Sequence, residues 1–64
     1  MPNKDTAASI DAELRALKNG PATSRWLSAG IATAMTRDPI DAANDAEILA
    51  DLLKRRADAI LKSY

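Results

Sequence analysis

The strongest constraint on this chain is that its 64 residues include neither cysteine nor histidine. A domain of this size buries only about 60% of the surface that its unfolded chain exposes, so its stability is marginal. Small domains usually gain the missing stability from disulfides, from a structural metal ion or from association with another chain. The absence of both residue types excludes disulfides and the commonest zinc ligands. We therefore expect association to complete the fold, and we expect no cofactor and no metal.

The composition favours α-helix. Fourteen residues are alanine, and the larger apolar side chains are mostly leucine and isoleucine, with no valine and no phenylalanine. Strands prefer β-branched and aromatic residues, whereas Ala, Leu, Glu, Lys and Arg favour helices. We predict an all-α fold, a small helical hairpin or three-helix bundle with a long C-terminal helix, completed by self-association. Residues 1–64 should form a single domain, with residues 1–5 disordered, because polar chain ends usually fray.

Capping residues and apolar spacing predict the first two helices. The first runs from about Thr6 to Asn19, and Gly20 and Pro21 end it. Glycine adopts the left-handed conformation of a helix C-cap, and proline cannot continue a helix. The second helix runs from about Ser24 to Thr36, and we expect it to be the most enclosed of the three.

The third predicted helix begins near Asp38 and Pro39, since Asp at the N-cap and Pro at the first helical position are a strong start signal. A second start signal lies at Asn44 and Glu47. The sequence leaves two options open: one helix from Pro39, or a separate turn over Pro39–Ala43 before the main helix. Along this helix acidic residues come first and basic residues later, which complements the helix dipole.

The third helix carries more apolar surface than two short helices are expected to cover. On a helical wheel its apolar residues span an arc of roughly 220°, whereas an ordinary surface helix needs a stripe of a little over 100°. Leftover apolar surface on so small a protein usually marks an interface. The predicted protein-interface residues are Ile48, Leu49, Leu52, Leu53, Arg56, Ile60 and Leu61, together with Asp45, Trp26 and Tyr64. The alternative is that the whole arc packs inside the single chain.

Two charges and one aromatic residue near this arc have competing interpretations. In an antiparallel pairing of two such helices, Asp45 of one chain would face Arg56 of the other and fix the register. Alternatively, the stem of Arg56 lies along the apolar surface while its head reaches water. Trp26 is either a core anchor, the commoner role of a lone tryptophan in a central helix, or a partly exposed interface anchor.

No pattern in the sequence indicates catalysis. The serines have no imidazole to activate them, because histidine is absent. Carboxylates four apart, such as Asp41 and Asp45, lie in the first half of a helix, where acids are favoured in any case. The two glycines do not form a phosphate-binding loop. We predict a non-enzymatic protein with no catalytic, cofactor-binding or metal site and no small-molecule substrate.

The charge balance and the hydropathy of the chain indicate which classes of partner and which cellular location to expect. Nine basic residues balance nine acidic ones, which does not suit a general nucleic-acid binder. No apolar run approaches the ~20 residues of a membrane span, and the first residues lack the apolar region of a secretory signal. We therefore expect a cytoplasmic protein that does not bind membranes.

The function that we predict is a protein–protein interaction module that binds a second copy of itself or another protein and acts as a small regulatory or accessory protein. One alternative is a dimeric helix-turn-helix DNA-binding regulator, since Ala16, Gly20 and Trp26 loosely follow the spacing of that motif. The second helix would then offer four side chains to a DNA groove: Ser24, Arg25, Ser28 and Arg37. The other alternative is an accessory subunit that covers an apolar surface on a larger enzyme.

Overall fold

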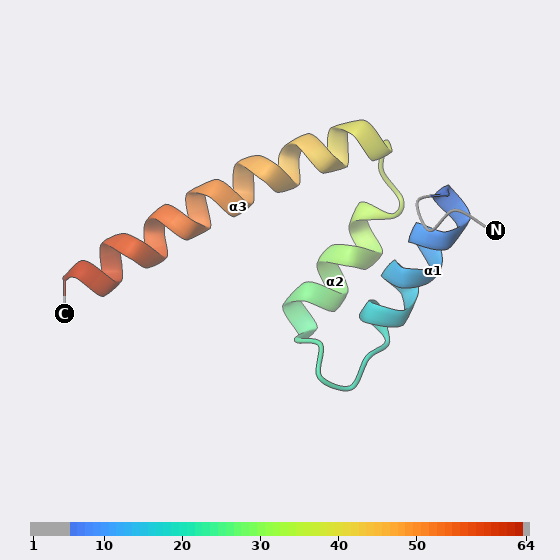
Figure 1. The fold of residues 1–64 in the computed structure, drawn as a ribbon, viewed down its shortest axis with the longest axis horizontal. Helices are drawn as coiled ribbons and strands as arrows, with labels where there is room; N and C mark the ends of the chain where they lie inside the picture. The colour runs from blue at the N-terminus through green and yellow to red at the C-terminus, as the bar shows by residue number, and fades with distance from the viewer. Residues whose placement is uncertain (1–5, 64) are drawn as a thin grey trace.

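The computed structural model describes residues 6–63, which form three α-helices joined by short connections (Figure 1). Helix α1 spans Ala7–Lys18, α2 spans Arg25–Ala34 and α3 spans Pro39–Lys62. Helices α1 and α2 lie side by side as an antiparallel hairpin, and α3 runs away from it. The predicted all-α class with a long C-terminal helix is confirmed. The disorder predicted for residues 1–5 and the interface role predicted for Tyr64 fall outside the described residues.

Each helix begins at a side-chain cap of a type that the sequence predicts. The side-chain oxygens of Thr6, Ser24 and Asp38 each accept a hydrogen bond from the backbone N–H three residues later, at 3.2, 3.1 and 3.0 Å. Such caps each contribute about 0.5–2 kcal/mol to helix stability. Helix α3 is continuous from Pro39, so the option of a separate turn over Pro39–Ala43 is wrong. The helix therefore begins at the Asp38–Pro39 start signal and continues through the second signal at Asn44 and Glu47.

The end of α1 differs from the predicted left-handed glycine cap. Asn19 is the C-cap and Gly20 does not have a positive φ, so that prediction is wrong. The backbone N–H groups of Asn19 and Gly20 instead donate to the carbonyl oxygens of Arg15 and Leu17, at 3.0 and 3.1 Å. The Thr23 hydroxyl also donates to the Leu17 carbonyl at 2.6 Å. A side-chain hydroxyl therefore satisfies a helix-terminal carbonyl and makes the left-handed turn unnecessary.

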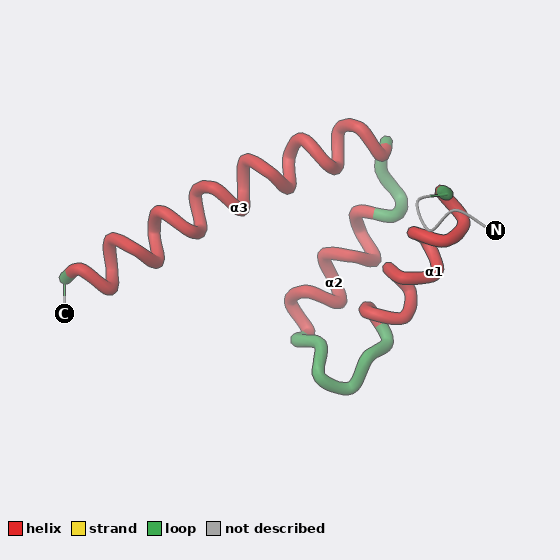
Figure 2. Tube along the Cα trace, viewed as in Figure 1, coloured by secondary structure: helices red, strands yellow, loops and turns green. Residues whose placement is uncertain are grey.

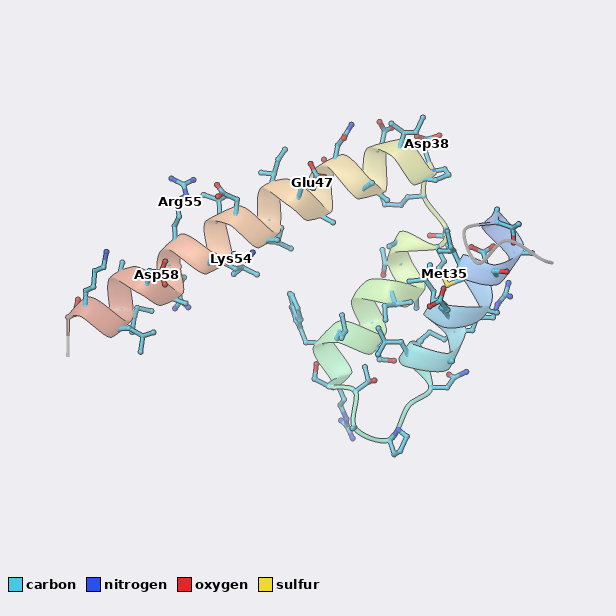
Figure 3. All side chains as sticks on the ribbon, in the orientation of Figure 1. Met35, Asp38, Glu47, Lys54, Arg55 and Asp58 are labelled. Atoms are coloured by element: carbon cyan, nitrogen blue, oxygen red, sulfur yellow. The ribbon has the colours of Figure 1, made fainter. Side chains whose placement is uncertain are left out.

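The hairpin encloses a small core centred on α2. Ile31, which is 6% exposed, is the one buried residue that the structure describes, and Leu14 and Met35 are half-buried. Figure 3 shows Met35 between α2 and α1. The Ser28 hydroxyl donates to the Lys18 carbonyl at 2.9 Å and ties α2 to the end of α1. Among the described helices only α2 holds a buried residue, which agrees with the prediction that it is the most enclosed.

The hairpin leaves most of α3 uncovered. Beyond Ala42 every described residue of α3 is exposed, and the Cα radius of gyration is 14.6 Å, against about 10.7 Å expected for a compact chain of this length. At 1.5 Å per residue, α2 is about 15 Å long and α3 about 36 Å, so α2 is too short to cover α3. The connection between them is also short (Figure 2). The alternative in which the whole apolar arc packs inside the single chain is therefore wrong.

Candidate functional site

Helix α3 presents a line of large apolar side chains to solvent. The six aliphatic residues that the sequence predicts as an interface have exposed fractions from 37% for Ile60 to 69% for Leu61. We call these six residues the apolar strip: Ile48, Leu49, Leu52, Leu53, Ile60 and Leu61. Monomeric proteins rarely expose large contiguous apolar patches, and such patches usually mark interaction sites. The predicted contact face is therefore open in the single chain.

An open groove lies where α3 leaves the hairpin. It has a volume of about 430 Å³ and runs between α2 and the first three turns of α3. Small residues form most of its walls: Ala29, Gly30 and Ala34 from α2, and Ala42 and Ala46 from α3. Two large apolar side chains, Trp26 and Leu49, also line it, and Leu49 belongs to the apolar strip as well. The groove and the strip therefore form one continuous surface.

Trp26 lies on this groove at the start of α2, with 67% of its surface exposed. The core-anchor interpretation is therefore wrong. Ile31 faces the hairpin core, and Trp26 lies about 140° around the helix from Ile31, so α2 turns Trp26 away from α1. Its second predicted role, that of an interface anchor, is compatible with an exposed position beside an apolar groove and stays a prediction.

An ion pair joins the two sides of the groove. Arg37 Nη2 lies 3.0 Å from Asp45 Oδ2, and both side chains are about half exposed. The sequence did not reveal this pair, because Arg37 follows the end of α2, Asp45 lies in the second turn of α3, and no helical spacing links them. An exposed pair of this kind contributes at most about 1 kcal/mol. It nevertheless helps to hold the start of α3 against the end of α2.

The predicted Asp45–Arg56 pair does not form within one chain. The two residues are eleven positions apart on a straight helix, which is about 16 Å, and Asp45 is paired with Arg37. Arg56 is exposed on the same side of α3. A pair between Asp45 of one copy and Arg56 of another stays a prediction.

Four further charged residues of α3 lie on the side opposite Leu53: Asp51, Arg55, Asp58 and Lys62. Arg55 Nε is 3.1 Å from Asp51 Oδ2, four residues earlier, in an exposed pair. Figure 3 shows Arg55 pointing away from the helix into solvent. By contrast, Asp58 and Lys62, also four apart, form no ion pair. The Asp51–Arg55 pair therefore faces solvent on the side of α3 away from Leu53.

The chemistry that this surface offers is apolar contact area with charges at its edges. Within residues 6–63, no group of three or more acidic side chains is placed to hold a metal ion. None of the three described helices is both long and apolar enough to cross a membrane. The polar residues on the groove are few, chiefly Thr33 and the Arg37–Asp45 pair. An apolar centre with a polar rim is the usual composition of a protein–protein contact.

Comparison of the chain with protein-family models, with curated proteins and with solved structures gave no match. The candidate site is therefore defined by the geometry of this chain alone: the apolar strip on α3, the groove beside α2 and the charges that border them. Sequence reasoning assigned three of the residues that line the groove to the site, Trp26, Asp45 and Leu49, and did not assign the other seven: Ala29, Gly30, Thr33, Ala34, Arg37, Ala42 and Ala46.

Proposed function

We propose that this chain is a non-enzymatic protein–protein interaction module that self-associates through α3 and acts as a small regulatory or accessory protein of the cytoplasm. The observation that carries the proposal is the apolar strip, six aliphatic side chains left exposed on a helix that projects from its hairpin. Burial of apolar surface is the main favourable term in protein association.

The exposed area of the chain supports self-association. The chain has a solvent-accessible surface of 5716 Å² at a mass of 6.8 kDa, whereas a folded monomer of this mass has about 4,000 Å². The excess is roughly twice the ~800 Å² that each partner contributes to a standard interface. Association therefore has enough surface to supply the stability that the hairpin, with one buried residue, lacks.

Most of the side chains that would contact DNA in a helix-turn-helix protein make contacts within the chain instead. The Ser24 hydroxyl caps α2, and the Ser28 hydroxyl donates to a carbonyl of α1. Arg37 is paired with Asp45. Trp26, which that motif would use as a core residue, is exposed. No observation favours this function over protein binding, and we do not propose it.

The test of the proposed function is the mass of the purified chain in solution, measured by sedimentation velocity over a wide range of concentrations. We expect a dimer or higher oligomer that dissociates on dilution. The substitution Ile60→Glu places a charge in the apolar strip and should shift the chain to monomer. Ile60 is exposed in the single chain, so this change should not unfold the hairpin.

Ile40→Glu is the matched control. Ile40 is also an exposed isoleucine of α3, but it lies about 160° around the helix from Ile60. It should leave the oligomer intact. A wild-type chain that is monomeric at every concentration would overturn self-association, and equal effects of the two substitutions would show that the apolar strip is not the contact face.

A further inference from the structure

One face of α3 has the residue spacing of a coiled coil. Its residues alternate at intervals of four and three, and we call them the seam: Ala42, Ala46, Leu49, Leu53, Arg56 and Ile60. This spacing is the heptad pattern with which one helix packs along another. Alanines recur every seven residues beside the seam, at Ala43, Ala50 and Ala57. Such small flanking residues allow a second helix to approach closely.

The charges of α3 select the direction of that second helix. Residues 38–51 include five acids and no base, whereas residues 52–63 include four bases and one acid. A parallel pair of α3 helices would place like charges beside each other along its whole length. An antiparallel pair places the acidic half of each helix beside the basic half of the other, which is electrostatically complementary. The partner that fits this face is therefore a second copy of α3 in the opposite direction.

The seam also sets the register of the pair. In an antiparallel coiled coil the two kinds of heptad core position face each other. Full overlap of the two seams then places the two-fold axis at the level of Asp51. Leu53 then faces Leu49 of the second copy at the centre, and Arg56 faces Ala46. The central layer is large and apolar, and next to it a long side chain meets an alanine. These pairs match in volume, as close packing requires.

The outer layers of this register are complementary as well. Ile60 faces Ala42 of the second copy, again a large side chain against a small one. Arg56 comes within one position of Asp45 of the second copy, so the long guanidinium side chain can reach that carboxylate while Arg37 holds its other side. The register predicted from the Asp45–Arg56 pair and the register set by the seam differ by only one position.

The groove beside α2 lies where the second helix would run. The α3 residues that line it, from Ala42 to Leu49, are opposite residues 53–60 of the second copy. On the α2 wall, a Cβ added at Gly30 would meet nothing within 4 Å. Glycine weakens a helix interior relative to alanine, and close approach of another chain is a common reason to keep it. Within the single chain no neighbour requires the glycine, whereas a helix in the groove would.

We infer that this chain forms an antiparallel homodimer in which residues 53–60 of each α3 fill the groove between α2 and α3 of the other copy. The inference rests on the proposed self-association and adds its geometry. Each hairpin thereby gains a third helix from its partner. This arrangement explains why the apolar arc of α3 is wider than one helix contact needs. One side of α3 contacts the second α3, and the adjoining side contacts α2 of the second copy.

Single-cysteine variants test the geometry directly, because the wild-type chain has no cysteine. The dimer is treated with a short bismaleimide cross-linker. Ala50→Cys lies beside the two-fold axis and should cross-link to its own copy. Ala43→Cys and Ala57→Cys should each fail alone and should cross-link when the two variants are mixed. Ala46→Cys, a seam position far from the axis, should not cross-link to itself.

The possible outcomes separate this geometry from the proposed function. Self-cross-linking of Ala46→Cys without that of Ala50→Cys would show a parallel dimer, and would overturn the inference while leaving self-association intact. A dimer in sedimentation with none of these cross-links would show contact through another surface and would also overturn it. A chain that is monomeric in sedimentation and gives no cross-links would overturn both proposals.

Occupation of the groove is tested separately by Gly30→Leu. The space beside Gly30 is open in the single chain, so the leucine should not disturb the hairpin, but it would block an incoming helix. We expect dimerisation to weaken about tenfold or more, which is the usual effect of an extra side chain in a packed contact. Ala32→Leu is the control, since Ala32 is exposed and lies outside the groove. Equal dimerisation of the two variants would show that the groove is not filled.

Discussion

Leu53 is the residue whose truncation should most clearly reveal how α3 associates. It keeps 41% of its surface exposed in the single chain and lies at the centre of the proposed pair. Full burial of a leucine side chain is worth about 1.5–3 kcal/mol, so covering the exposed part is worth about 0.6–1.2 kcal/mol. A symmetric dimer contains Leu53 twice. Leu53→Ala should therefore cost the dimer roughly 1–2.5 kcal/mol, which weakens its Kd by about 5- to 60-fold.

The assay is sedimentation equilibrium of the wild-type and Leu53→Ala chains, with circular dichroism of each at a concentration where it is monomeric. The substitution should leave the helix content of the monomer nearly unchanged, because alanine is a better helix former than leucine and Leu53 is exposed there. Ile40→Ala is the control. Ile40 is 71% exposed on the opposite side of α3, so its truncation should leave the Kd within about twofold, as is usual for surface positions.

Two results would refute this reasoning. A Kd of Leu53→Ala equal to that of the wild type would mean that Leu53 is not covered in the dimer. A fall in the helix content of the monomer would mean that Leu53 supports the fold of the single chain, so that the loss of association is indirect.

Other perturbations test the hairpin and the charges of α3. Thr23→Val removes the 2.6 Å hydrogen bond to the Leu17 carbonyl and should destabilise the fold by about 1 kcal/mol in thermal unfolding. Gly20→Ala would place a Cβ 3.2 Å from Thr23 Oγ1 and 3.3 Å from the Leu17 carbonyl oxygen; since both atoms are held by the helix end, the melting temperature should fall. Higher salt should weaken the dimer several-fold, because it screens the attraction between the acidic and basic halves of α3; a dimer that strengthens with salt would contradict the antiparallel arrangement.

The helices and their caps could be predicted from the sequence because they depend on local chemistry. Thr6, Ser24 and Asp38 each bond to a backbone group three residues away, so the relevant neighbours are adjacent in the chain. The all-α class follows from alanine and leucine content in the same way. The width of the apolar arc on α3 likewise needs only the helical period, and it correctly indicated that this face is not covered.

Features that depend on the path between helices could not be predicted. The place where α3 leaves the hairpin decides that Trp26 is exposed and that Arg37 meets Asp45. Neither follows from spacing along a helix. The glycine at position 20 illustrates the same limit, because the Thr23 hydroxyl replaces the left-handed cap that Gly20 was expected to form. A side chain six residues from its acceptor gives no periodic signal.

The Asp45–Arg56 contact between copies is the most direct test of the register. Arg56→Asp would replace an attraction with a repulsion at two symmetric positions. An exposed pair is worth about 0.2–1 kcal/mol, so the two together are worth about 0.4–2 kcal/mol and the Kd should weaken by roughly 2- to 30-fold. Adding Asp45→Arg restores the opposite charges across the interface and should recover part of the loss.

The recovery should be partial because of Arg37. This guanidinium lies 3.0 Å from the Asp45 carboxylate in the single chain, so an arginine at position 45 would meet a like charge from its own chain. Adding Arg37→Gln to the double variant removes that repulsion and should bring the Kd closer to the wild-type value. Arg37→Gln alone is measured as the baseline for the triple variant, because Arg37 lines the groove and has its own effect on the Kd. If the triple variant binds no better than Arg56→Asp alone, the two residues do not meet across the dimer and the proposed register is wrong.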